Sequence, residues 1–174
     1  MIHGIADPRN RALAGRGVRA TGKDWPMIQV LVADDHEDVR RRLIRLIGRA
    51  SDMSVAAEAA DGVEVLERFE TTDIDVALLD LTMPRKGGIE TLRELLPRHP
   101  EAKVLIVSMH PPEQLARRMI RAGARGYVGK DRAAECLLDA IRAVHGGNVY
   151  VDGGAEMPRP APPSRDREVP TEAR

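Results

Sequence analysis

Short, continuous apolar runs alternate with amphipathic segments along residues 28–145, and this alternation indicates the fold class. Five of the runs have the character of strands: Ile28–Ala33, Met53–Glu58, Val76–Leu79, Lys103–Ser108 and Gly126–Gly129. Continuous apolar runs are typical of strands that are buried on both faces of a parallel sheet. The segments that follow them have helical spacing: Glu37–Ala50, Gly62–Phe69, Ile89–Leu96, Glu113–Ala122 and Ala133–His145. Strands that alternate with helices predict right-handed βαβ units and an α/β fold.

Capping and helix-breaking residues mark the ends of several predicted helices. Asp61 precedes the second helix, and its carboxylate is expected to cap the first free N–H groups. Pro97 and Pro100 are expected to stop the third helix at Leu96. Gly123 is expected to close the fourth helix, because glycine tolerates the left-handed conformation found there.

The two ends of the chain lack the regular pattern of its middle. Residues 1–26 show neither a strand nor a helix period, and residues 153–174 contain five of the 12 prolines. We therefore expect a disordered N-terminal extension over 1–26, one folded domain over 27–150 and a flexible proline-rich tail over 151–174. Because a strand begins directly after Met27, that methionine is also a candidate start of the protein.

Composition narrows the class of protein. Apolar residues make up 43% of the 174 residues, which is enough for a core. No apolar run approaches the roughly 20 residues of a membrane span, and residues 1–26 contain no signal-peptide core. The single cysteine, Cys136, excludes an internal disulfide, so we expect a cytoplasmic protein. Residues 27–152 hold 18 basic and 21 acidic residues, which is not the basic surface of a nucleic-acid binder.

Polar side chains stand at the ends of four predicted strands. Asp34 and Asp35 follow the first strand, Asp80 follows the third, Ser108 ends the fourth and Lys130 follows the fifth. In a parallel sheet these ends meet at one edge, where open α/β sheets place their ligands. Three neighbouring carboxylates would repel one another unless a hard cation such as Mg²⁺ bound between them. The arrangement suits nucleophilic attack by Asp80 on a phosphoryl group, with Ser108 and Lys130 holding the phosphoryl oxygens.

Each of these residues, taken singly, also has an ordinary structural explanation. Asp34 and Asp35 could stabilise the N-terminus of the helix that follows them. Ser108 could be a loop hydroxyl, Lys130 a solvated end and Tyr127 a core residue. The functional interpretation depends on all of them meeting at one sheet edge.

Four motifs in a fixed order identify a family resemblance. They read VLVADDH at 30–36, LLDLTMP at 78–84 followed by Gly88, VLIVS at 104–108, and GARGYVGKD at 123–131. Residues 27–150 thereby resemble the response-regulator receiver domain of two-component signalling, of the NarL/FixJ type. The resemblance implies a flavodoxin-like (βα)5 three-layer sandwich whose five-stranded parallel sheet has the order 2-1-3-4-5.

The resemblance also implies a role for each matching site residue. Asp80 would be the phosphoacceptor, and Lys130 would contact the phosphoryl group. Asp34 and Asp35 would hold Mg²⁺ together with Asp80 and the backbone carbonyl of Thr82.

Further roles concern the response to phosphorylation. Ser108 and Tyr127 would form a switch pair, in which the hydroxyl moves toward the phosphate and the aromatic ring turns inward. Thr82 and His110 occupy positions that tune dephosphorylation in this family. His36 and His110 lack metal-ligating partners at a suitable spacing, so we interpret them as loop residues. The arginines of the first helix either form a solvated face or dock a sensor kinase.

The first functional hypothesis is a phosphoacceptor switch rather than a conventional enzyme. A histidine kinase would phosphorylate Asp80, and the output would pass through protein contacts, with a phosphorylation-dependent homodimer as one form. The alternative is a truncated or partner-assisted DNA-binding regulator. NarL/FixJ regulators carry a C-terminal helix-turn-helix, and residues 163–169 resemble only its opening, so we do not expect this chain to bind DNA alone. A Mg²⁺-dependent phosphohydrolase is a third hypothesis, but Thr82 stands where its second carboxylate would be needed.

Overall fold

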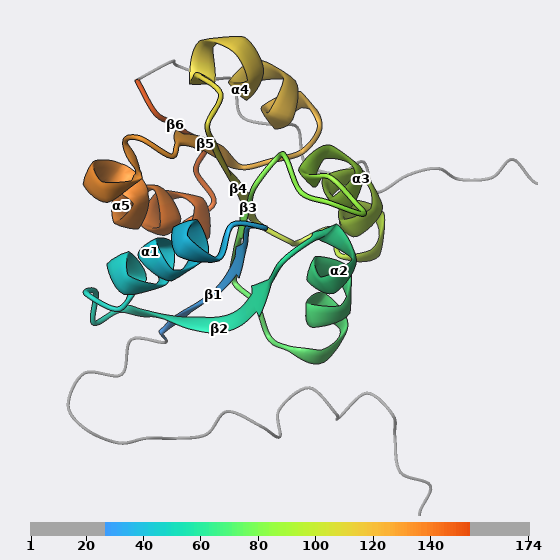
Figure 1. Cartoon of the computed structure of the whole chain (residues 1–174), viewed down its shortest axis with the longest axis horizontal. Coiled ribbons are helices and arrows are strands. Elements are labelled where there is room, and N and C mark those ends of the chain that lie inside the picture. The colour runs from blue at the N-terminus through green and yellow to red at the C-terminus, as the bar shows by residue number, and fades with distance from the viewer. Residues whose placement is uncertain (1–26, 154–174) are drawn as a thin grey trace, which may run out of the picture.

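A computed structural model of the protein describes residues 27–153 as a parallel sheet with helices on both faces (Figure 1). Strands and helices alternate along the chain as the apolar pattern predicts. In chain order they are β1 (Ile28–Ala33), α1 (Glu37–Ile47), β2 (Met53–Ala59), α2 (Gly62–Thr71), β3 (Val76–Leu79), α3 (Gly88–Arg98), β4 (Val104–Ser108), α4 (Pro112–Arg121), β5 (Gly126–Gly129), α5 (Ala133–His145) and β6 (Tyr150–Val151).

The strand order is β2-β1-β3-β4-β5-β6, and every pairing is parallel. The order of the first five strands confirms the order that the family resemblance implies. The sixth strand was not predicted, because two residues are too few to show a strand period. The tail expected from residue 151 therefore begins inside a strand, which pairs Tyr127 with Val151.

Each strand face packs on its own set of helices, so there are two cores. Val30 and Val32 point into the core formed with α1 and α5. Leu31 and Ala33, on the opposite face of β1, point into the core formed with α2, α3 and α4. Burial on both faces explains why β1, β3 and β4 lack polar alternation in the sequence.

The helix ends follow the expected chemistry at α2 and α4 but not at α3. Asp61 caps α2 by accepting hydrogen bonds from the N–H groups of Val63 (2.8 Å) and Glu64 (3.1 Å). Gly123 follows α4 with φ +105°, the left-handed conformation in which glycine is favoured. Pro97 does not stop α3, which continues to Arg98.

Several expectations concern residues outside the described range. The disordered extension, the part of the flexible tail after residue 153 and the helix-turn-helix-like segment at 163–169 all lie there. Among the helices over residues 27–153, none has the length and apolar character needed to cross a bilayer.

Candidate functional site

The carboxyl ends of β1 and β3 place two acidic side chains beside each other. Asp34 and Asp80 are 1% and 4% exposed, so both carboxylates are buried. Their backbones extend the strand ladders: Asp34 N donates to Ala59 O at 3.2 Å, and Asp80 N donates to Ala33 O at 3.0 Å. The positions of these acids therefore follow directly from the strand register.

Gly88, at the start of α3, lies against the backbone of Asp80. A β-carbon at residue 88 would overlap the carbonyl oxygen of Asp80. Its N–H donates to the carbonyl of Leu81 at 3.0 Å, and Leu81 N in turn donates to Asp80 Oδ1 at 2.8 Å. The glycine thus lets α3 begin close beside the Asp80 loop.

Lys130, which follows β5, connects the two carboxylates. Its Nζ lies 2.6 Å from Asp34 Oδ2 and 3.2 Å from Asp80 Oδ2, and all three side chains are buried. Its backbone N–H donates to Ser108 O at 2.8 Å, which fixes the end of β5 against β4. The structure therefore brings three of the predicted residues, from three strands, into direct contact.

The surroundings of Asp80 act on its pKa in opposite directions. Burial raises the pKa of Asp80, and the charge of Asp34 raises it further, while Lys130 acts in the opposite direction. The carboxylates of Asp34 and Asp80 share one ammonium, that of Lys130, which contacts an oxygen of each. Two buried carboxylates that share a single positive charge are a donor set that suits a hard divalent cation.

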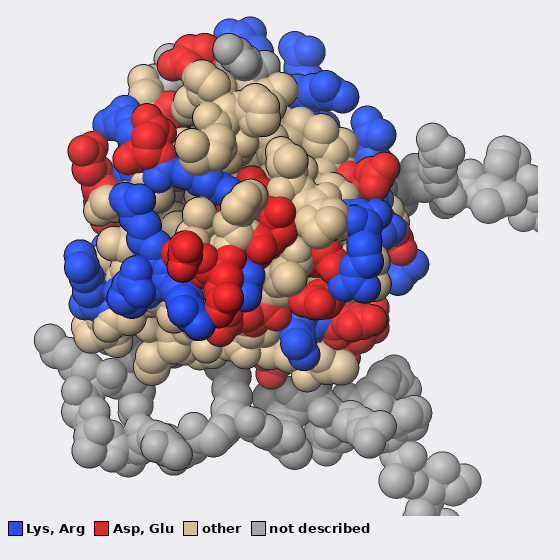
Figure 2. Space-filling view, viewed as in Figure 1, with Lys and Arg blue, Asp and Glu red and all other residues tan. Residues whose placement is uncertain are grey.

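Asp35 and His36 extend the acidic group toward solvent. The Asp35 side chain is 29% exposed, and its Oδ1 lies 2.9 Å from His36 Nδ1. One ligand atom from each of Asp34, Asp35 and His36 lies within 4.8 Å of the others. His36 lies in the loop before α1, as expected, and its ring is folded back beside the carboxylates of Asp34 and Asp35. Figure 2 shows acidic side chains gathered at the centre of the face it views, with basic side chains beside them over α1.

Ser108 and Tyr127 are buried near this centre but bond elsewhere. Ser108 Oγ accepts from the backbone N–H of His110 at 3.2 Å and lies 3.2 Å from His110 Nδ1. Tyr127 Oη donates to the carbonyl of His110 at 2.9 Å. The tyrosine ring is fully buried, so in this structure it already points inward. Thr82, by contrast, is exposed two residues beyond Asp80.

One residue close to the site belongs to the arginines of the first helix, which were expected either to form a solvated face or to dock a kinase. Arg40 of α1 donates from Nη1 to the carbonyl of Asp34 at 2.8 Å, and its side chain is 17% exposed. Helical spacing could not identify this contact, because it depends on how far a long side chain reaches back to the preceding loop. The arginines at 41, 42, 45 and 49 are exposed, as expected.

Comparison with known proteins identifies one kind of domain over most of the described residues. The sequence profile described as "Response regulator receiver domain" matches residues 30–142. The transcriptional regulatory protein DegU of Brevibacillus brevis is 34% identical over 124 residues, which cover 71% of this chain and 52% of DegU. The response regulator GacA of Pseudomonas viridiflava is 37% identical over 125 residues, covering 72% and 58% of the two chains.

A solved structure shows the same fold at similar identity. The two-component response regulator of the LuxR family from Aurantimonas sp. SI85-9A1 is 36% identical, with a TM-score of 0.66, over 71% of this chain and 89% of that one. The chain spans 52% and 58% of the lengths of DegU and GacA. A matching profile over most of the described residues shows the family: this chain belongs to the response regulator receiver domains.

Proposed function

We propose that this protein is a phosphoacceptor switch, with Asp80 as the residue that receives the phosphoryl group. The observation that carries the proposal is the position of Lys130 Nζ, 2.6 Å from Asp34 and 3.2 Å from Asp80. Family membership supports the same role, because receiver domains accept phosphoryl groups. Asp80 is favoured over Asp34 because it lies in the LLDLTMP motif, where the family resemblance places the phosphoacceptor.

The reaction requires Asp80 to be ionised and accessible to a phosphorus atom. A carboxylate oxygen of Asp80 would attack the phosphohistidine of a sensor kinase, forming an O–P bond as the N–P bond breaks. The electron pair of the broken bond stays on the histidine nitrogen. Lys130 neutralises the charge that the phosphoryl oxygens bring into a buried site.

Mg²⁺ fits the donors of this site. Asp34, Asp35, Asp80 and the backbone carbonyl of Thr82 would hold it. The buried carboxylates of Asp34 and Asp80 have only the Lys130 ammonium to share between them over residues 27–153. When bound, the ion supplies the positive charge that lets three carboxylates and a phosphoryl group approach one another.

The switch pair would convert the new charge into a change of surface. Ser108 Oγ now bonds within its own loop, and it would exchange that contact for a phosphoryl oxygen. Tyr127 shares the loop through the carbonyl of His110, so movement of the loop reaches the buried ring.

The surrounding system follows from this function. The protein would act in the cytoplasm with a sensor histidine kinase as its partner. The output would be a contact with another protein or with a second phosphorylated copy. Signalling of this kind does not require turnover of a separate substrate. Self-phosphotransfer and autodephosphorylation would be its only chemistry.

A phosphorylation assay tests the assignment. Wild-type protein treated with acetyl phosphate and Mg²⁺ should gain the mass of one phosphoryl group, and Asp80→Asn should not. Asp131→Asn is a matched control, because Asp131 is exposed and directly follows Lys130. An equal mass gain in wild type and Asp80→Asn would show that the phosphoacceptor lies elsewhere.

DNA-binding regulation is the second candidate function. It is favoured by the name of DegU, a transcriptional regulatory protein, and by the fact that this chain covers only 52% of it. Gel-shift assays at low salt, with and without acetyl phosphate, distinguish the two functions. A phosphoacceptor that acts through proteins alone should shift no DNA in either state.

A further inference from the structure

Arg40 differs from the other arginines of α1 in its surroundings. Its side chain is 17% exposed, whereas the side chain of the next residue, Arg41, is 62% exposed and pairs only with Glu37. Arg40 Nη1 donates to the carbonyl of Asp34 at 2.8 Å, and Nε donates to Glu58 Oε2 at 3.1 Å. One guanidinium thus connects the β1–α1 loop to the end of the edge strand β2.

The carbonyl that Arg40 binds belongs to the peptide between Asp34 and Asp35. Fixing that peptide limits how the two carboxylates on either side of it can turn. The backbone N–H of Arg40 also donates to His36 O at 3.0 Å, so main chain and side chain both fold the loop onto α1. A hydrogen bond from a charged donor is stronger than one between neutral groups.

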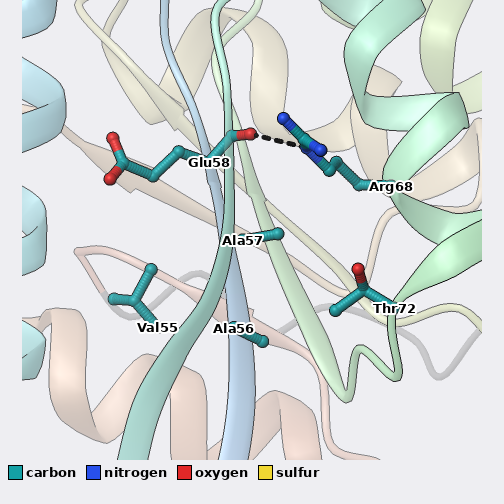
Figure 3. A pocket seen from close by; sticks show the side chains of 6 residues that line it. All are labelled: Val55, Ala56, Ala57, Glu58, Arg68 and Thr72. Atoms are coloured by element: carbon teal, nitrogen blue, oxygen red, sulfur yellow. Dashed lines mark hydrogen bonds between the residues drawn. The ribbon is translucent and has the colours of Figure 1, made fainter.

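The second anchor, Glu58, is itself held in place. Arg68 of α2 donates from Nε to the carbonyl of Glu58 at 3.2 Å, as the dashed line in Figure 3 shows. Arg68 lies on one side of β2 in that view, and the Glu58 carboxylate points to the other side, toward Arg40. Contacts therefore run from α2 through β2 to Arg40, which binds the β1–α1 loop that carries Asp34 and Asp35.

We infer that Arg40 is a positioning residue, which holds Asp34 and Asp35 in the arrangement that binds the divalent cation. The inference rests on the proposed function of the site and extends it to a residue outside the acidic cluster. Arg40 would contact neither the phosphoryl group nor the ion. It acts through the peptide that carries both acids.

The direction in which cation affinity changes distinguishes a positioning role of Arg40 from an effect of its charge. Removing a positive side chain near a cation site should strengthen cation binding, because it removes repulsion. Removing a side chain that orients the ligands should weaken binding, and partners behind metal ligands typically contribute roughly 10- to 100-fold in affinity. Because Arg40 acts through a backbone carbonyl, we expect the lower end of that range.

The test is a titration of the ¹⁵N-labelled 174-residue protein with MgCl₂, in which the NMR chemical shifts of the backbone amides report Mg²⁺ binding. Arg40→Met should weaken Mg²⁺ binding about tenfold, through loss of the held peptide. Arg41→Met, a matched loss of one positive charge on the same helix, should leave affinity unchanged or slightly higher. Arg40→Lys should restore part of the loss, because an ammonium keeps the charge but cannot reproduce the forked contacts.

Thermal unfolding without Mg²⁺ separates positioning from general damage. Arg40→Met should have the lower midpoint in chelator, because it loses two charge-assisted hydrogen bonds, and it should also gain less stability than Arg41→Met when Mg²⁺ is added. Equal Mg²⁺ affinity in Arg40→Met and Arg41→Met would overturn the inference. It would leave the proposed function intact, since that function fails only if wild type binds no Mg²⁺ or Asp80 accepts no phosphoryl group.

A second pair of variants serves if Arg40→Met does not fold. Glu58→Gln weakens the outer anchor of Arg40 and should lower Mg²⁺ affinity about threefold, because the charge-assisted bond is lost. Glu37→Gln removes the same charge from the exposed start of α1 and controls for electrostatics. Identical affinities in these two variants would also contradict the positioning role.

Discussion

Two polar clusters lie at the same edge of the sheet but are connected differently. The acid centre consists of Asp34, Asp80 and Lys130, and the switch cluster consists of Ser108, His110 and Tyr127. In the acid centre, charged groups that follow β1, β3 and β5 touch one another, and one ammonium contacts both buried carboxylates. In the switch cluster, neutral groups from two chain segments bond to one another.

The difference shows which cluster is prepared for a ligand and which must be rearranged. The acid centre holds two buried carboxylates against one ammonium, so an added cation relieves repulsion without breaking a neutral hydrogen bond. The switch cluster is satisfied internally, so Ser108 must leave His110 before it can bind a phosphoryl oxygen. A hydrogen bond from the backbone N–H of Lys130 to the carbonyl of Ser108 connects the acid centre directly to the switch cluster.

The largest effect is expected from removing the ammonium of the acid centre. Lys130→Met leaves two buried carboxylates without their cation and should lower the free energy of unfolding by about 3 kcal/mol at neutral pH. Added Mg²⁺ should recover part of this loss, because it replaces the missing positive charge. Urea unfolding in chelator and in Mg²⁺ measures both effects.

Lys103→Met is the matched control for this loss. Lys103 Nζ donates to the carbonyl of His145 at 2.7 Å and pairs with no carboxylate of residues 27–153. Its replacement should cost about 1 kcal/mol, and Mg²⁺ should not reduce that cost. If Mg²⁺ protects both variants equally, the acid centre is not the place where the cation acts.

The next largest effect concerns the switch cluster. Tyr127→Phe keeps the buried ring but removes the hydrogen bond to His110 O, and should lower the free energy of unfolding by about 1.5 kcal/mol. Mg²⁺ affinity should stay at the wild-type value, because the acid centre does not use the phenol. A variant that lost Mg²⁺ affinity as well would show that the clusters are already coupled in the unphosphorylated protein.

The meeting of residues in the acid centre could be predicted because it depends only on topology. Asp80 and Lys130 directly follow strands of one parallel sheet, and the ends of such strands have to share an edge. The continuous apolar runs that identify those strands are long enough to be seen without a structure. Strand order, in contrast, came from the family resemblance, because no local pattern states which strands are neighbours.

The contacts that were not predicted depend on side-chain reach or on very short elements. Arg40 looks like any exposed helical arginine until the loop before α1 brings the carbonyl of Asp34 within its reach. His36 turns back onto the carboxylates for the same reason. β6 has two residues and pairs only because α5 returns the chain beside β5. The inward ring of Tyr127 is a rotamer choice, which a residue pattern does not encode.

A smaller effect, of opposite sign, is expected at Asp80, the proposed phosphoacceptor. Burial and the charge of Asp34 raise the pKa of Asp80, which means that its ionised form is unfavourable in the metal-free fold. Asp80→Asn removes that charge and should raise the free energy of unfolding in chelator by about 1 kcal/mol. Asp131→Asn should cause no comparable gain, because Asp131 is exposed. A destabilised Asp80→Asn would mean that the attraction to Lys130 outweighs the repulsion.

The smallest effect is expected in an alkaline titration, which follows the two tyrosines of the chain. Tyr127 lies in β5 and Tyr150 lies in β6. Burial raises the pKa of Tyr127, and raises that of Tyr150 to about 12, against an ordinary value of 10.0. Unfolded tyrosines ionise first as the pH rises above 10, so stability should fall between pH 10 and 12. The buried Cys136 thiol, whose pKa is also raised, adds a loss that begins nearer pH 9. Tyr150→Phe should flatten the upper part of this curve, as followed by urea unfolding at each pH. An unchanged curve would mean that the Tyr150 phenol ionises as readily in the folded protein as in the unfolded chain.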